Sequence, residues 1–165
     1  MPPSLQYDFL DACRRGDLQQ VKELFTINNM LINTEDAKGF TPLIIAVYNN
    51  QAEVTDFLLS NGARTESQDA SGNTALMGAA FKGYKVLVEK LLNAGADVNQ
   101  RNYQGANALT FAATFGQMEI AELLLQKGAD MFAEDVRGKS PLDHAVIQEN
   151  EPMVLLLERY ASNGQ

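Results

Sequence analysis

The sequence contains no tryptophan, one cysteine and one histidine in 165 residues. The single cysteine, Cys13, excludes an intrachain disulfide and fits a reducing compartment, so we expect a cytoplasmic protein. One cysteine and His144 are also too few for the usual zinc sites. The chain has no apolar run approaching the roughly 18 residues of a membrane span, and residues 1–10 lack the pattern of a signal peptide.

Charge and motifs argue against several classes of function. A net charge of −8 disfavours binding to nucleic acid or to an anionic membrane. Neither GxGxxG nor GxxxxGK[ST] occurs, so no phosphate-binding loop is indicated. Ser140, Asp143 and His144 superficially suggest a catalytic triad, but Asp143 and His144 would point about 100° apart on a helix, and Ser140 is better explained as an N-cap. We expect no enzyme, no cofactor and no metal.

A period of 33 residues dominates what the sequence does contain. Gly39, Gly72, Gly105 and Gly138 follow one another at this spacing. The segments around them read DAKGFTPLIIA, DASGNTALMGA, NYQGANALTFA and DVRGKSPLDHA. A fixed period of this length is typical of a stacked array, because one supersecondary unit alone cannot bury its apolar face.

Each copy predicts two helices. A good N-cap residue begins the first helix, at Thr41, Thr74, Asn107 and Ser140. Leucine and alanine then recur three residues apart, and Gly83, Gly116 and Asn50 are expected to end this helix in left-handed conformations. The second helix is predicted over 54–59, 87–92, 120–125 and 153–157.

The hexapeptides TPLIIA, TALMGA, NALTFA and SPLDHA occupy the place of the ankyrin TPLHxA signature. Over nearly its whole length the chain resembles the ankyrin-repeat family. Its sequence, notably the segment GNTALMGAAFKGY, is similar to those of small stand-alone bacterial members. The usual histidine is replaced in every copy, by Ile44, Met77, Thr110 and Asp143. The resemblance implies an all-α solenoid with short β-like fingers. The single domain 1–165 would contain five helix-turn-helix units: an N-terminal cap at 5–35, repeats at 36–68, 69–101 and 102–134, and a C-terminal cap at 135–165.

The resemblance also implies a binding surface on the concave side, formed by the fingers and by the exposed ends of the first helices. We call the set of residues carried over to this surface the predicted interface. It consists of Arg14, Arg15, Lys38, Phe40, Tyr48, Asn49, Asn73, Phe81, Lys82, Arg101, Tyr103, Gln104, Thr114, Phe115, Arg137 and Lys139.

Aromatic and basic side chains are frequent in this set. The finger positions, their preceding neighbours and the helix-end positions together hold 7 of the 13 basic residues but only two of the 21 acids, Glu35 and Glu134. A basic, aromatic surface on an acidic body predicts a protein or peptide partner with acidic and apolar groups. Two alternatives stay open: some aromatics could pack locally between repeats, or the charges could form a solvated mixture without function.

The function predicted from these features is non-enzymatic protein binding through the concave surface, as an adaptor or an inhibitor. The alternative is a regulator or maturation factor of a metabolic or stress-response enzyme. We expect a monomer, because polar substitutions such as Glu158 close the end of the array.

Overall fold

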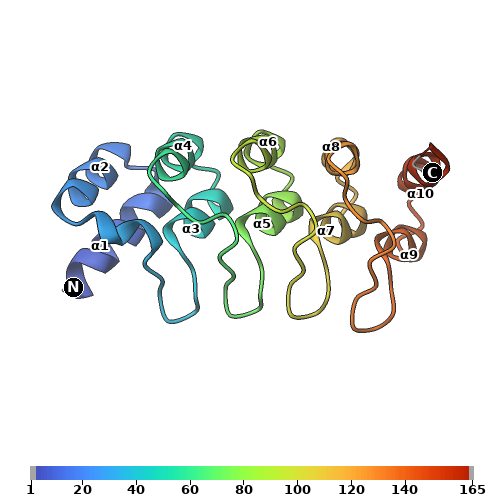
Figure 1. Cartoon of the computed structure of the whole chain (residues 1–165), viewed down its shortest axis with the longest axis horizontal. Helices are drawn as coiled ribbons and strands as arrows, with labels where there is room; N and C mark the ends of the chain where they lie inside the picture. Colours follow the sequence, from blue (N-terminus) through green and yellow to red (C-terminus); the bar gives the residue numbers. More distant parts are fainter. Residues whose placement is uncertain (1–2, 164–165) are drawn as a thin grey trace.

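The computed structural model describes residues 3–163, which form ten α-helices and one 3-10 helix without a strand. The helices stand in pairs along one row, and a long loop projects from each junction toward the same side (Figure 1). The arrangement is a helical solenoid, as the period predicted. The outermost positions of the predicted domain, 1–2 and 164–165, lie outside the described residues.

Two rows of helices run along the array. The inner row, next to the loops, consists of α1 (Pro3–Arg15), α3 (Pro42–Tyr48), α5 (Ala75–Lys82), α7 (Ala108–Thr114) and α9 (Pro141–Ile147). The outer row consists of α2 (Leu18–Ile27), α4 (Ala52–Ser60), α6 (Lys85–Asn93), α8 (Met118–Gln126) and α10 (Glu151–Asn163), with the 3-10 helix η1 (Asn29–Asn33) after α2. The four outer helices α4, α6, α8 and α10 extend beyond the apolar segments that predicted them, because their polar ends carry no periodic signal.

The predicted N-caps of the inner helices are confirmed. The side chains of Thr41, Thr74, Asn107 and Ser140 each accept a hydrogen bond from the backbone N–H three residues later. Left-handed residues follow the inner helices as expected, with φ values of 57° at Asn50, 81° at Gly83 and 69° at Gly116. Glu149 takes the same conformation in the last unit, with φ 55°, although its residue type gave no such indication.

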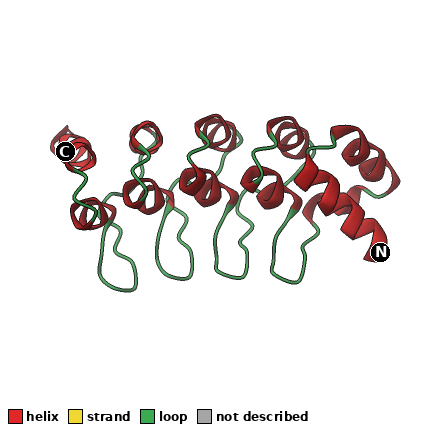
Figure 2. Cartoon of the chain, turned by 180° about the vertical axis from the view of Figure 1, so that it is seen from behind, coloured by secondary structure: helices red, strands yellow, loops and turns green. Residues whose placement is uncertain are grey.

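The leucine and alanine positions of the inner helices form the core. Leu43, Leu76 and Leu109 are buried, and the alanines three residues later are fully buried. These small side chains let successive inner helices pack closely, and the inner row is continuous from α1 to α9 (Figure 2). Outer helices contact their neighbours less. The inner row therefore sets the alignment of every junction.

The loops between repeats are the predicted fingers, and the backbone links each to the next. The N–H groups of Ala70, Tyr103 and Val136 donate to carbonyls of the preceding finger, those of Lys38, Ser71 and Gln104, at 2.9, 3.2 and 2.9 Å. One bond per junction is too little for a strand ladder. The fingers are thus parallel loops, and their alignment leaves side chains at 33-residue spacing side by side.

Candidate protein-binding surface

The predicted interface lies along the ends of the inner helices and the adjoining fingers. Arg14, Tyr48, Phe81 and Thr114 stand at equivalent positions near the ends of α1, α3, α5 and α7. Asn49, Lys82 and Phe115 form a second series of equivalent positions, one residue further on. The structure therefore brings the helix-end members into two adjacent rows, each with one residue per repeat.

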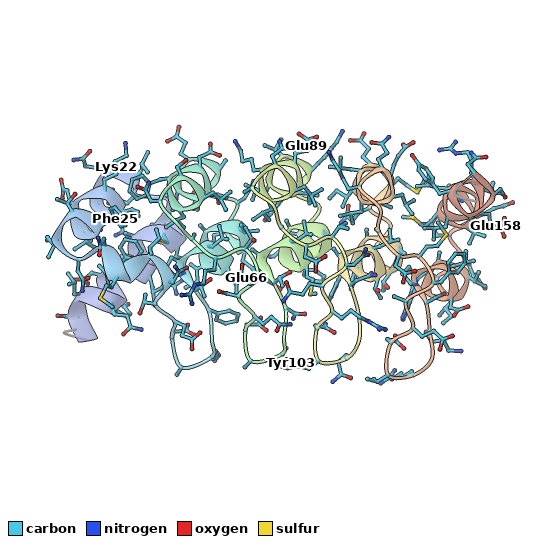
Figure 3. The ribbon with its side chains drawn as sticks, in the orientation of Figure 1. Lys22, Phe25, Glu66, Glu89, Tyr103 and Glu158 are labelled. Carbon is cyan, nitrogen blue, oxygen red and sulfur yellow. The ribbon has the colours of Figure 1, made fainter. Side chains whose placement is uncertain are left out.

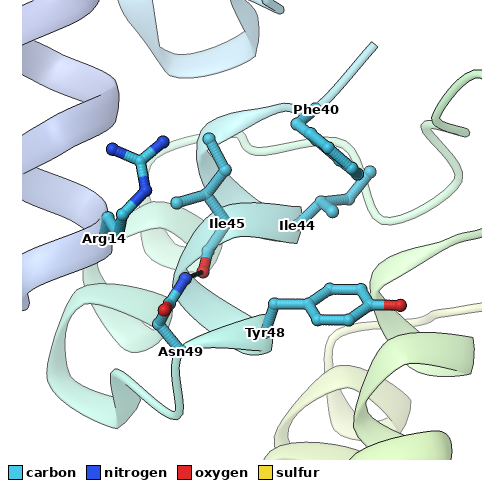
Figure 4. Close-up of a pocket in the computed structure, with 6 residues that line it drawn as sticks. All are labelled: Arg14, Phe40, Ile44, Ile45, Tyr48 and Asn49. Carbon is cyan, nitrogen blue, oxygen red and sulfur yellow. Dashed lines mark hydrogen bonds between the residues drawn. The ribbon is translucent and has the colours of Figure 1, made fainter. Parts of the chain in front are cut away.

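A pocket of about 230 Å³ opens between α1 and α3 (Figure 4). Four of its lining residues belong to the predicted interface: Arg14, Phe40, Tyr48 and Asn49. Ile44 and Ile45 complete the lining and are almost fully buried. Ile44 replaces the histidine of the repeat signature, but this departure did not by itself predict a pocket.

Polar groups lie at the edge of this apolar pocket. The Arg14 guanidinium is about half exposed and lies 3.3 Å from a carboxylate oxygen of Asp11. The Asn49 amide nitrogen donates to the Ile45 carbonyl at 2.8 Å, which fixes the side chain against α3. The pocket combines an apolar interior with a cationic donor and an amide at its edge.

Arg15 adds less positive charge to the surface than its place in the sequence suggested, because acidic side chains pair with it. Its guanidinium lies 2.8 Å from Asp11 and 3.4 Å from Asp17, and it also donates to the Gln20 side chain. The hydrogen bond from Arg15 holds the pKa of Asp11 below its usual value. Asp11 was not in the predicted interface, so the surface is less positive at its α1 end than the sequence indicated.

Tyr48 occupies the junction between α3 and α5. Its ring lies directly over Gly78, where an added Cβ would come within 2.8 Å of the ring. The Lys82 ammonium lies 5.7 Å from the ring centroid, at cation–π distance. Burial, reinforced by the negative charge of Asp69, raises the pKa of the Tyr48 phenol, which therefore stays a neutral donor at physiological pH. Tyr48 both packs between repeats and faces the surface.

An aromatic cluster occupies the junction between α5 and α7. The Phe81 ring meets Phe115 edge-on with centroids 4.7 Å apart, and Phe111 at 6.4 Å. Phe115 is nevertheless 51% exposed, whereas Phe81 is half-buried. Phe111 was not in the predicted interface and is half-buried in this cluster. Local packing therefore accounts for Phe81, and Phe115 presents the exposed aromatic surface.

In the fingers, Arg101 acts as a clamp as well as a surface charge. It donates to the backbone carbonyls of Gly105, at 2.9 Å, and of Glu134 in the next finger. Gln68 stands 33 residues earlier and does the same with the carbonyls of Gly72 and Arg101, at 2.8 and 3.0 Å. The guanidinium of Arg101 therefore links its own finger to the next one. The alignment of Arg101 with Gln68 in the 33-residue series could have indicated this linking role.

The remaining finger residues of the predicted interface are mostly exposed. Tyr103 is 63% exposed, and its ring borders Gly72 of the preceding finger (Figure 3). Asn73 instead accepts a hydrogen bond from Asn102 at 2.8 Å, which ties its side chain to the neighbouring finger. Exposed positions at the finger tips are Lys38, Gln104, Arg137 and Lys139.

Comparison with known proteins identifies the repeat. The family profile of ankyrin repeats (3 copies) matches residues 9–102 and 87–164. The chain belongs to the ankyrin-repeat family. Ankyrin repeats are general protein–protein interaction modules, so the fold implies protein partners.

A curated relative matches over a shorter range. A stretch of 56 residues is 43% identical to BTB/POZ domain-containing protein 3 of Schizosaccharomyces pombe (strain 972 / ATCC 24843). This stretch covers 34% of the ankyrin chain and 11% of that protein. The similarity is limited to a small part of the relative.

In this ankyrin array, two of the residues that resembled a triad bond each other, whereas His144 has a different partner. The Ser140 hydroxyl donates to Asp143 at 3.1 Å and accepts from the Asp143 backbone N–H, which makes a capping box. His144 instead lies 2.8 Å from a carboxylate oxygen of Asp135. Cys13 is fully buried, and burial raises the pKa of its thiol to about 12, so it is not an activated nucleophile.

Residues 3–163 contain no group of three or more His, Cys, Asp or Glu side chains placed to hold a metal ion. None of the described helices has the length and apolar character needed to cross a membrane.

Proposed function

We propose that this ankyrin-repeat protein binds a partner protein or peptide through the predicted interface and does not itself catalyse a reaction. The observation that carries the proposal is the apolar pocket between α1 and α3 beside Arg14, with Lys82 and Phe115 on the next repeats. Exposed apolar groups next to cations suit a partner with apolar side chains flanked by carboxylates. Such binding would serve an adaptor or an inhibitor, in a reducing, cytoplasmic setting.

Charge distribution supports a protein partner over nucleic acid. Acids stand on the outer helices, such as the half-buried Glu89 on α6 and the exposed Glu158 on α10 (Figure 3). With a net charge of −8, the molecule as a whole repels a polyanion. The basic side chains near the fingers are local, so they would steer an acidic protein segment without holding a long phosphate backbone.

The test of this proposal replaces two finger residues together. Arg101→Gln keeps a clamp of the kind made by Gln68 and removes the charge, while Tyr103→Ala removes an exposed ring. A partner captured from source lysate by the wild-type protein should bind this double variant at least about tenfold more weakly by titration calorimetry.

The matched control lies on the outer row. Glu122→Lys reverses a charge that lies 3.3 Å from Arg159 on exposed surface, and it should change affinity by less than about threefold. Equal effects of the finger and outer-row variants would show that the partner binds elsewhere.

A further inference from the structure

We propose that the predicted interface recognises an extended acidic segment with the pattern apolar–acidic–apolar, its three key residues spaced three apart and read by three successive repeats. This inference rests on the proposed function and specifies the partner's chemistry. It follows from the equivalent positions Asn49, Lys82 and Phe115, which lie 33 residues apart but have very different surroundings.

We call the surface beside each of these three residues a step of the array, and the first step is the pocket beside Asn49. Its volume of about 230 Å³ is below the range of roughly 300–1,000 Å³ typical of small-molecule sites, and it suits one inserted side chain. Ile44, Ile45 and Phe40 give it an apolar interior, so the favoured occupant is a leucine-like or aromatic residue.

The second step, beside Lys82, offers a cation where the first offers a cavity. The Tyr48 ring lies over Gly78 and occupies the space beside it at this junction. The Lys82 ammonium lies over that ring, and no carboxylate of the described residues lies within 4.0 Å of it. An acidic side chain of a partner would supply the missing counter-charge.

The third step is apolar again. The Phe115 ring is supported edge-on by Phe81 at 4.7 Å, yet half of it remains exposed. A second apolar side chain of the partner would cover this surface, because an exposed, rigidly supported aromatic ring is a typical interface anchor. The three steps therefore alternate in chemistry along the array.

Repeat spacing fixes the spacing of the pattern. Packed helices lie about 8–10 Å apart. A segment in the extended polyproline II conformation advances about 3.1 Å per residue with three residues per turn, so its side chains three residues apart lie on one face and one repeat corresponds to about three residues. Arg14 provides N–H donors at the edge of the first pocket, and among the described residues the Asn49 side-chain oxygen accepts no hydrogen bond. An extended segment has free backbone groups to pair with both, whereas a helix has used its own.

The experiment uses synthetic acidic peptides and fluorescence anisotropy. One peptide carries Leu-x-x-Glu-x-x-Leu, a second compresses it to Leu-x-Glu-x-Leu, and a third scrambles the same composition. We expect the first to bind at least about tenfold more tightly than the others, because only it reaches all three steps.

Two substitutions locate the effect. Ile45→Phe should fill the pocket and remove the preference for the three-residue spacing, and the array already carries phenylalanine at the equivalent position, Phe111. Lys82→Gln, on an exposed side chain, should weaken binding of the spaced peptide several-fold, whereas loss of the contact with the Tyr48 ring should lower the melting temperature by no more than about 4 °C.

The outcomes separate this inference from the proposed function. Equal affinities for the three peptides, with binding still weakened by Lys82→Gln, would overturn the spacing and leave the surface assignment standing. Failure of every peptide to bind would overturn the pattern, whereas the captured partner tests the surface independently. A partner indifferent to all finger and inner-helix substitutions would overturn both.

Discussion

At the scale of single residues, one asparagine bridge between repeats is missing from the array. Asn33 bonds the Gly62 carbonyl at 3.1 Å and the Arg64 N–H at 2.9 Å, and Asn99 does the same with Gly128 and Asp130, at 3.1 and 2.7 Å. Glu66 stands between them in the 33-residue series, and its carboxylate makes no such bridge.

Glu66→Asn should restore this bridge, to Gly95 and Asp97, and stabilise the protein. Two exposed hydrogen bonds contribute about 1 kcal/mol together, at the lower end of the range for such bonds. Urea denaturation would measure the change. The reciprocal variant Asn99→Glu should lower stability by a similar amount, and a stabilising effect of Asn99→Glu would contradict the explanation.

A second prediction at this scale concerns Asp135 and His144. Burial alone would raise the pKa of Asp135, but hydrogen bonds from the Lys139 N–H, His144 and the Arg137 N–H lower it below its usual value. A carboxyl with a depressed folded-state pKa stabilises the protein above its unfolded pKa of about 3.9, and this stability is lost as pH falls through the folded value.

His144→Ala should therefore raise the pH at which acid unfolds the protein, because one interaction that favours ionised Asp135 is gone. Partner binding at neutral pH should change by less than about threefold, since His144 has a structural partner. Acid titration followed by circular dichroism measures the first effect, and Asp135→Asn, the counterpart of Asn102, should remove the contribution of this carboxyl. Loss of partner binding in His144→Ala, with stability unchanged, would show that this histidine has a functional role.

At the scale of helices, the outer row should lose most stability where a helix packs between two neighbours. Leu91 on α6, Leu124 on α8 and Leu157 on α10 are all fully buried at equivalent positions. Leu91→Ala or Leu124→Ala should cost about 2–5 kcal/mol, since each helix packs between two neighbours. Leu157→Ala should cost less, and chemical denaturation that ranked it as the most damaging would show that the last unit is no terminal cap.

The sequence was most informative about helices and least informative about contacts between copies. Caps such as Thr41 and left-handed Asn50 were predictable because local chemistry determines them. Glu149 was not, because only its alignment with Asn50 indicates a positive φ. The Arg101 clamp depends on the relative position of two fingers, which no single repeat specifies.

At the scale of the whole molecule, the fold followed from the period, but the surface did not follow from composition. The predicted interface includes four of the residues that line the pocket but not Ile44 and Ile45, which complete the lining. Its charge was also overestimated near α1, where Asp11 pairs with Arg14 and Arg15. Pairing of this kind depends on side-chain geometry, so a count of charged residues at equivalent repeat positions could not reveal it.

The distribution of charge over the whole molecule leads to a kinetic prediction. Basic side chains such as Lys38, Lys82 and Lys139 are exposed on the finger and inner-helix side of a chain with a net charge of −8. An acidic partner would be steered to that side during diffusion, and steering is screened over about 8 Å at physiological salt. Raising the salt concentration should therefore slow association more than it speeds dissociation in stopped-flow measurements. Lys82→Gln should reduce this salt dependence and Glu122→Lys should not, because only the first removes charge from the approach path. A salt effect confined to dissociation would mean that the contacts are apolar and that the basic side chains do not steer the partner.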